Sequence, residues 1–219
     1  NTALGAFALS ADTKGDKSVA VGVVALASQN FTTVTDTYNV GVGYSAGGAI
    51  TTGIKNTIVG GLAGDALTDA DENVAIGVSA LGADTLGSKT TAIGQGALQV
   101  QNFTTATDTY NVAVGFSAGN QVTTGIQNVL VGDQAGDALT DSDNNVAIGS
   151  QALTADTLGT RSVAIGRRAL STQNFTTSTE VYNVAIGFNA GKNVTTGIYN
   201  TLVGALSGDA LTDADNNVA

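Results

Sequence analysis

Short segments in which β-branched residues alternate with small ones recur along the whole chain. In Val74-Ala75-Ile76, an extended backbone places Val74 and Ile76 on one face and Ala75 on the other. The same alternation occurs at 112–114, 146–148, 163–165 and 184–186. We expect each segment to be a short β-strand of a coil. We expect Val and Ile to fill the inside of the coil, and the thin Ala face to allow close approach of another backbone.

A glycine follows each of these segments at a fixed spacing. Gly77 follows Ile76, at a point where a chain that turns sharply has no room for a Cβ atom. The steps between successive glycines of this kind are seventeen, twenty-one, seventeen and seventeen positions, and the cycle repeats without a slip. The spacing predicts twelve coils of these two lengths, each turning at its glycine. These glycines are Gly5, Gly22, Gly43, Gly60, Gly77, Gly94, Gly115, Gly132, Gly149, Gly166, Gly187 and Gly204.

Four coils make one larger repeat. Three such units occupy 1–72, 73–144 and 145–216, and positions 217–219 begin a further unit. We therefore expect the chain to be a fragment of a longer array.

The segments between the strands are rich in residues that form turns. TTGIxN and GDALTDxD recur in every unit, and their Gly, Asn and Asp residues favour positive φ angles and side-chain bonds to the backbone. Ala80 and Leu81 are expected to begin a second short run that returns the chain. In stacked coils, Asn39, Asn56 and Asn73 would lie one above another as an amide ladder. The predicted fold class is all-β, a repetitive parallel β-roll or β-solenoid.

Such short coils make a thin ribbon, and this predicts an assembly of several chains. A single ribbon would leave its Ala face in water, whereas three ribbons around one axis would bury it. We therefore expect a homotrimeric fibre. The rival is a monomeric three-sided solenoid, which needs an apolar residue at every sixth position. Val74, Ile76, Ala80, Leu81 and Leu86 do not keep that spacing.

Composition narrows the class of protein. Hydrophobic residues make up 42% of the 219 residues, but aromatic residues only 5%, which suits neither a compact globule nor a disordered chain. The net charge of −10 argues against a nucleic-acid partner, and no apolar stretch is long enough for a membrane span. The chain has no His and no Cys, so the usual catalytic bases and thiol nucleophiles are missing. We expect no enzyme and no required cofactor.

The motif N-V-A-I-G-x-x-A, at 73–80, 145–152 and 183–190, resembles the head repeats of YadA-like trimeric autotransporter adhesins. Variants such as N-T-A-L-G at 1–5 and N-T-L-V-G at 200–204 are also similar to repeats of phage tail-fibre proteins. The resemblance implies a left-handed parallel β-roll, three rolls in one head, and surface attachment as the function.

One coil in each unit carries an insertion, QNFTTxT, with a phenylalanine. An exposed aromatic ring in such a loop gives a large contact area at low entropic cost. Phe31, Phe103 and Phe175 are therefore candidate surface contacts, to a sister subunit or to a host-surface glycan or protein. The alternative is that each ring plugs the space under its own loop.

The acidic turns offer a second candidate. Asp65, Asp69 and Asp71, with their copies in the other two units, could supply oxygen ligands to Ca²⁺. The spacing matches no known calcium loop, and turn formation explains the same residues.

Three functions remain open. The first is a structural fibre or stalk segment of an extracellular trimeric appendage, a phage tail fibre or a bacterial surface adhesin that mediates attachment. The second is an adhesin that binds through its own repeated loops. The third is a functional amyloid or homopolymeric surface filament, because low charge and the absence of Pro also suit cross-β stacking.

Overall fold

The computed structural model describes residues 1–219 and contains strands and turns but no helix. It comprises two compact units, Asn1–Tyr110 and Asn111–Ala219. From here on, "unit" means one of these two parts, and the four-coil segments are called repeats. None of its elements is a helix that could cross a lipid bilayer.

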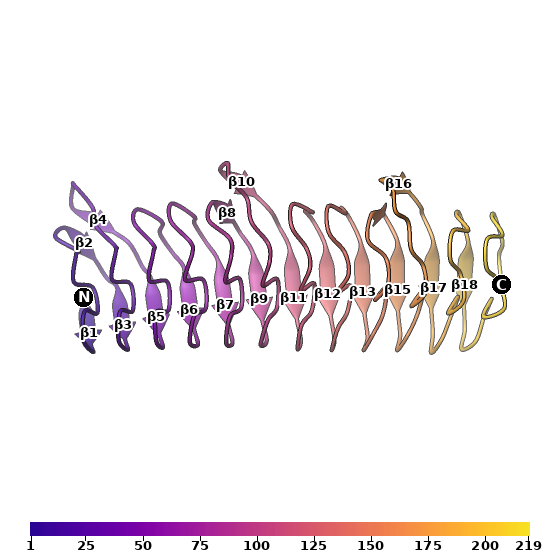
Figure 1. The fold of residues 1–219 in the computed structure, drawn as a ribbon, viewed down its shortest axis with the longest axis horizontal. Helices are drawn as coiled ribbons and strands as arrows, with labels where there is room; N and C mark the ends of the chain where they lie inside the picture. The colour runs from indigo at the N-terminus through magenta and orange to yellow at the C-terminus, as the bar shows by residue number, and fades with distance from the viewer. The chain divides into compact units, whose positions relative to one another are not determined.

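Each unit is a parallel β-solenoid, which confirms the predicted fold class. Within a unit, the main strands pair in chain order, and every partner lies one coil further along (Figure 1). Val74 pairs with Thr91 across one of the shorter coils, and Val19 pairs with Val40 across one of the longer coils. The main strands of the first unit are β1 (Thr2–Leu4), β3 (Val19–Val21), β5 (Val40–Val42), β6 (Thr57–Val59), β7 (Val74–Ile76) and β9 (Thr91–Ile93). Those of the second unit are β11 (Val112–Val114), β12 (Val129–Val131), β13 (Val146–Ile148), β15 (Val163–Ile165), β17 (Val184–Ile186) and β18 (Thr201–Val203).

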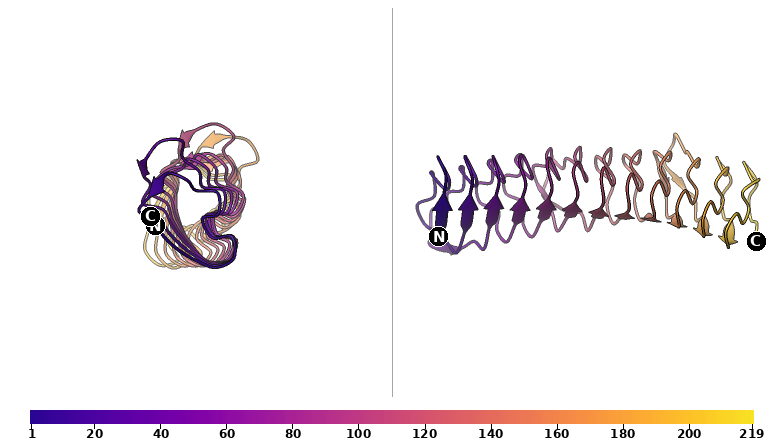
Figure 2. Two further views of the ribbon diagram at one scale, coloured as in Figure 1. Left: turned by 90° about the vertical axis from the view of Figure 1, so that its left-hand side faces the viewer. Right: turned by 90° about the horizontal axis from the view of Figure 1, so that it is seen from below.

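The insertions form additional two-stranded pairs beside the main sheet. Viewed along the stack, the coil outlines of each unit largely superimpose, and the longer loops project beyond them (Figure 2). The pairs are β2 (Gly15–Asp16) with β4 (Thr35–Asp36), β8 (Gly87–Ser88) with β10 (Thr107–Asp108), and β14 (Gly159–Thr160) with β16 (Thr179–Glu180).

The strands point the opposite way from the sequence-based prediction. Ala75 is fully buried inside its own coil, whereas Val74 is half-buried and Ile76 is 36% exposed on the outside. The same holds for the central residue of other strands, such as Ala20 and Ile58. A three-residue strand directs one side chain to one face and two to the other. Because the coil is thin, it has room for only the single central side chain. The prediction that the Ala face meets sister chains is therefore wrong.

The core of a coil is filled jointly by the central strand residue and by residues on the opposite wall, so that a small residue in one place accompanies a large one in the other. Where Leu81 projects inward, the strand contributes only Ala75. Where the strand contributes Ile58, the position of Leu81 is taken by Gly64, and Leu67 fills the space instead. A Cβ on Gly64 would lie 2.9 Å from Leu67 Cδ1 and 3.1 Å from Ile58 Cδ1. Each fully buried Leu or Ile contributes about 1.5–3 kcal/mol, so keeping the core volume constant keeps each coil stable.

The return path also differs from the prediction. Ala80 and Leu81 lie in consecutive turns rather than in a second strand, with φ of 55° at Ser79 and 53° at Leu81. This wall is still bonded from coil to coil, because Leu81 N–H donates to the Ala97 carbonyl at 3.0 Å. These bonds hold non-glycine residues in the left-handed region, which otherwise costs about 1–2 kcal/mol per residue.

The twelve coil-turn glycines all have φ between 125° and 144°. At Gly60, a Cβ atom would lie 2.5 Å from the carbonyl oxygen of Gly77 in the next coil. The chain therefore requires glycine here for two separate reasons, the backbone angle and the close approach of the neighbouring coil.

Candidate functional site: an outward apolar face held by a polar column

A column of buried asparagines fixes the level of each strand and confirms the predicted amide ladder. Asn56 N–H donates to Asn39 Oδ1 at 2.9 Å, and Asn73 N–H donates to Asn56 Oδ1 at 3.0 Å. Asn56 Nδ2 also donates to the Ala70 carbonyl at 2.7 Å. All three asparagines are fully buried, so each bond satisfies a group that water cannot reach. The column holds each coil in register with the next.

The ladder changes in the coil that carries the insertion, where Asn is replaced by Ser18, Thr90 or Ser162. Ser18 and Thr90 bond to a threonine of the next coil instead of its asparagine, as Thr90 Oγ1 does to Thr109 Oγ1 at 2.6 Å, and a buried glutamine contacts the next asparagine. Gln29 Oε1 accepts from Asn39 Nδ2 at 2.9 Å. Sequence reasoning missed this joint, although the replacement of Asn in one coil of every four was visible.

A buried aspartate completes the joint. Asp84 Oδ1 accepts from Gly87 N–H at 3.1 Å and from Phe103 N–H at 3.0 Å, and Oδ2 accepts from Gln101 Nε2 at 2.6 Å. Burial raises the pKa of the Asp84 carboxyl, and these hydrogen bonds only partly offset that effect. Asp156 has the same environment and a pKa raised by the same cause. The aspartate therefore ties the insertion loop to the coil before it.

The phenylalanines of the insertions are plugs. Phe31, Phe103 and Phe175 are only 7%, 7% and 8% exposed. At Phe103 and Phe175, the backbone N–H is held by the buried aspartate, which turns the ring into the space under the loop. The surface-contact interpretation of these three residues is therefore corrected, because the rings are covered by their own chain.

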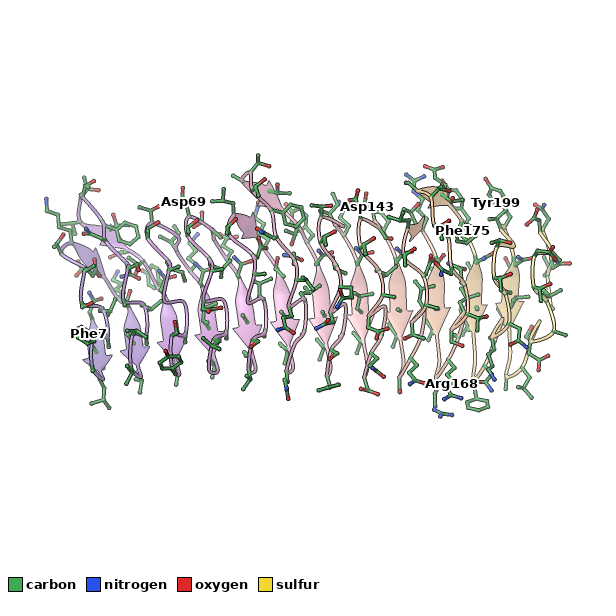
Figure 3. The ribbon with its side chains drawn as sticks, in the orientation of Figure 1. Phe7, Asp69, Asp143, Arg168, Phe175 and Tyr199 are labelled. Atoms are coloured by element: carbon green, nitrogen blue, oxygen red, sulfur yellow. The ribbon has the colours of Figure 1, made fainter.

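The acidic turns bond to the neighbouring coil. Asp69 Oδ1 accepts from Thr52 Oγ1 at 2.7 Å, and Asp71 Oδ1 accepts from Ile54 N–H at 2.7 Å. No group of three or more Asp or Glu residues that could hold a metal ion is present. Figure 3 shows Asp69 and Asp143 at the loop edge of their respective units. The bonds give these carboxylates a structural role between coils.

A cation, a carboxylate and a tyrosine meet at the base of each insertion. Lys17 Nζ lies 2.6 Å from Asp36 Oδ2 and 3.1 Å from the Tyr38 hydroxyl. The hydrogen bond to Asp36 raises the pKa of Lys17. Lys89 makes the same contacts with Asp108 and Tyr110, and Arg161 makes them with Glu180 and Tyr182. All of these groups are exposed or partly exposed, so the clusters fasten the surface of the loop to the preceding coil.

The outside of the main sheet is a regular apolar surface. We call the outward-pointing first and third residues of the main strands the strand face. In β5 these are Val40 and Val42, and in β13 they are Val146 and Ile148. Every residue of the strand face is Val, Ile, Leu or Thr, and none is charged, although the chain carries a net charge of −10. Contiguous exposed apolar patches are often binding surfaces in proteins.

A second exposed column adjoins the strand face. We call the two residues that follow each coil-turn glycine the corner column. Its aromatic members are Phe7, which is 70% exposed, and three residues that directly follow a coil-turn glycine, Tyr44, Phe116 and Phe188, which are 60%, 52% and 47% exposed. Sequence reasoning missed them and chose the buried phenylalanines, although the repetition of an aromatic residue directly after the glycine in all three repeats could have identified them.

No family model, curated protein or solved structure matches the chain.

Proposed function

We propose that this chain is a structural segment of an extracellular trimeric appendage that mediates attachment, a phage tail fibre or a bacterial surface adhesin. The observation that supports it best is the uncharged strand face, which repeats in every coil of each unit. Burying this face between copies removes apolar surface from water, at about 25 cal/mol per Å².

A second copy of the chain is the partner that suits this face. Two identical solenoids have the same rise per coil, so their rows of Val and Ile can interdigitate along the whole contact. A partner with another repeat length would match at a few coils only.

Two adjoining exposed strips, the apolar strand face and the mixed corner column, favour a ring over a pair. The strand face and the corner column offer each chain two contacts, one for each of two neighbours. Heterologous contacts of this kind close into rings when the rotation allows, and three thin chains close with the strand faces at the centre. In that arrangement the insertion loops face outward, where they can contact a host-surface glycan or protein.

The test is the solution mass of the wild-type chain and of two variants. The wild type is expected as a species of three times 21.6 kDa. Val114→Lys places a charge on the half-buried strand face and is expected to give a folded monomer, whereas Ser178→Lys, on an exposed insertion loop, is expected to leave the trimer intact. A monomeric wild type, or a trimer that survives Val114→Lys, would contradict the proposal.

The alternative is an amyloid-like or homopolymeric surface filament. In-register parallel pairing with like residues stacked at each level is the feature that favours it. The same mass measurement separates the two functions, because an open-ended polymer has no fixed size. Binding of the isolated trimer to an array of cell-surface glycans tests whether the segment itself attaches or only carries a binding tip.

A further inference from the structure

The strand face cannot by itself fix how two copies align. Its residues are nearly the same in every coil, as in Val146, Ile148, Val163 and Ile165. Sliding one chain past another by one coil, about 4.8 Å, would therefore replace each apolar contact with a similar one. Register is weakly specified wherever the side-chain pattern repeats without variation.

The corner column varies where the strand face does not. Only the third coil of each larger repeat has an aromatic residue directly after its coil-turn glycine, at Tyr44, Phe116 and Phe188. These rings are about half exposed. The other corner positions change between repeats, and Val23, Gln95 and Arg167 occupy equivalent places.

The backbone holds these aromatic residues at a defined level. The carbonyls of Tyr44, Phe116 and Phe188 each accept from an N–H of the next coil at 2.9 Å. The Arg167 guanidinium lies 5.8 Å from the centre of the Phe188 ring, one coil away. Figure 3 shows Arg168, a corner-column residue of the second unit, at the edge of its coil away from the loops.

We propose that Tyr44, Phe116 and Phe188 are register anchors that pack against a neighbouring copy of this chain and forbid sliding by one, two or three coils. The inference rests on the proposed self-association. A slip that moves an anchor by one coil places it at the level of a different corner residue, such as Arg167 or Asp133. A slip of four coils restores the aromatic levels within the second unit, but it sets Val23 level with Gln95 in the first unit and Asp133 level with Ala205 in the second. The anchors and the variable corner residues together select one alignment.

The experiment images the assembly by electron cryomicroscopy and compares the levels of the insertion loops on neighbouring chains. In the wild type, the loops of all copies are expected at the same level. In the triple variant Tyr44→Ser, Phe116→Ser and Phe188→Ser, the mass is expected to be unchanged, but classes of particles with loops offset by whole coils appear.

A matched control removes three other exposed tyrosines that also recur once per repeat. Tyr38, Tyr110 and Tyr182 are 50%, 51% and 39% exposed and lie at the loops. Their replacement by Ser is expected to leave the loops level. A triple variant with Leu at the three anchor positions keeps apolar bulk and is expected to restore the level loops in part. It replaces the serine variant in the experiment if the serine variant does not fold.

The outcomes separate the two proposals. A monomeric wild type contradicts the proposed function and the anchors together. A triple serine variant that still assembles with level loops contradicts the anchors alone. A triple variant that folds but no longer associates also contradicts the register role, because the rings would then supply the affinity rather than the alignment.

Discussion

Gly60 and Gly61 are neighbours in the sequence, yet the structure predicts opposite effects when each is replaced by alanine. Gly60 has a φ of 135°, and a Cβ there would meet backbone atoms of the next coil, Gly77 O at 2.5 Å and Gly77 C at 2.7 Å. Gly77 cannot move away freely, because its N–H donates to the Val59 carbonyl at 2.8 Å. A Cβ on Gly61 would meet nothing within 4 Å.

The magnitudes follow from two separate costs. A strained φ costs about 1–3 kcal/mol, and overpacking against a fixed backbone costs about 1–3 kcal/mol more. Gly60→Ala is therefore expected to lower the free energy of unfolding by about 4 kcal/mol. Gly61→Ala is expected to raise it by about 0.5 kcal/mol, because alanine restricts the unfolded chain. Gly204→Ala isolates the first cost, about 2 kcal/mol, because φ there is 133° but the nearest atom to a Cβ is 3.9 Å away.

Urea denaturation followed by circular dichroism at one fixed protein concentration measures these differences. With a slope of about 3 kcal/mol per M, Gly60→Ala is expected to lower the midpoint by about 1.3 M. The order of stability is expected to be Gly61→Ala, wild type, Gly204→Ala and then Gly60→Ala. If Gly60→Ala and Gly61→Ala shift the midpoint equally, the coils do not approach each other at Gly60 and the reasoning fails.

Other substitutions test the polar column and the insertion loops. Asn56→Ala leaves one backbone N–H and one carbonyl buried without partners and is expected to cost about 3 kcal/mol in urea denaturation; a loss below about 0.5 kcal/mol would show that the ladder is not buried. Phe103→Ser is expected to cost about 3–4 kcal/mol and to open the insertion to proteolysis, whereas an unchanged digest would restore the surface-contact interpretation. Burial raises the pKa of Asp84 in the folded state above its unfolded value. The protonated carboxyl therefore favours the folded state below the unfolded pKa, and this stabilisation is lost as pH rises through the folded pKa. The stability of Asp84→Asn relative to the wild type should therefore increase as pH rises above about 4, and a relative decrease would contradict the assignment. Lys89→Ala removes only an exposed contact and is expected to leave the urea midpoint nearly unchanged.

The periodic features could be predicted because they recur from coil to coil in the sequence. The spacing of the glycines predicted the coils, and the repeated Asn before each strand predicted the amide ladder. Such features depend on local backbone geometry and on stacking between coils, and each of these requires a particular residue type at a fixed position in the repeat.

The direction of the strands could not be predicted in the same way. Alternation shows that Ala75 and Ile76 face opposite sides, but not which side is inside. That choice depends on the opposite wall of the coil, where Leu81 already occupies the space. Hydrophobicity alone placed the larger residues inside, and the thinness of the coil reverses that choice.

The same limit applied to the aromatic residues. Phe103 lies in a polar loop and was a candidate surface contact, but the buried carboxylate of Asp84 holds its backbone and turns the ring inward. Phe116 follows a strand and a glycine, a position that suggests burial, yet it is 52% exposed. Exposure at these positions depends on contacts between coils that single motifs do not encode.

The most direct test of the account is the chemical reactivity of single cysteines, because the chain has none of its own. At Leu130→Cys the thiol replaces a fully buried side chain inside β12, and it is expected to stay unreactive until the coil unfolds, in the assembled protein and in the monomeric Val114→Lys background alike. At Val131→Cys the thiol lies on the strand face, and it is expected to be protected in the assembly but to react readily in the monomer. If the thiol at 130 reacts with the folded chain while the one at 131 does not, the strands face the other way and copies do not meet at the strand face.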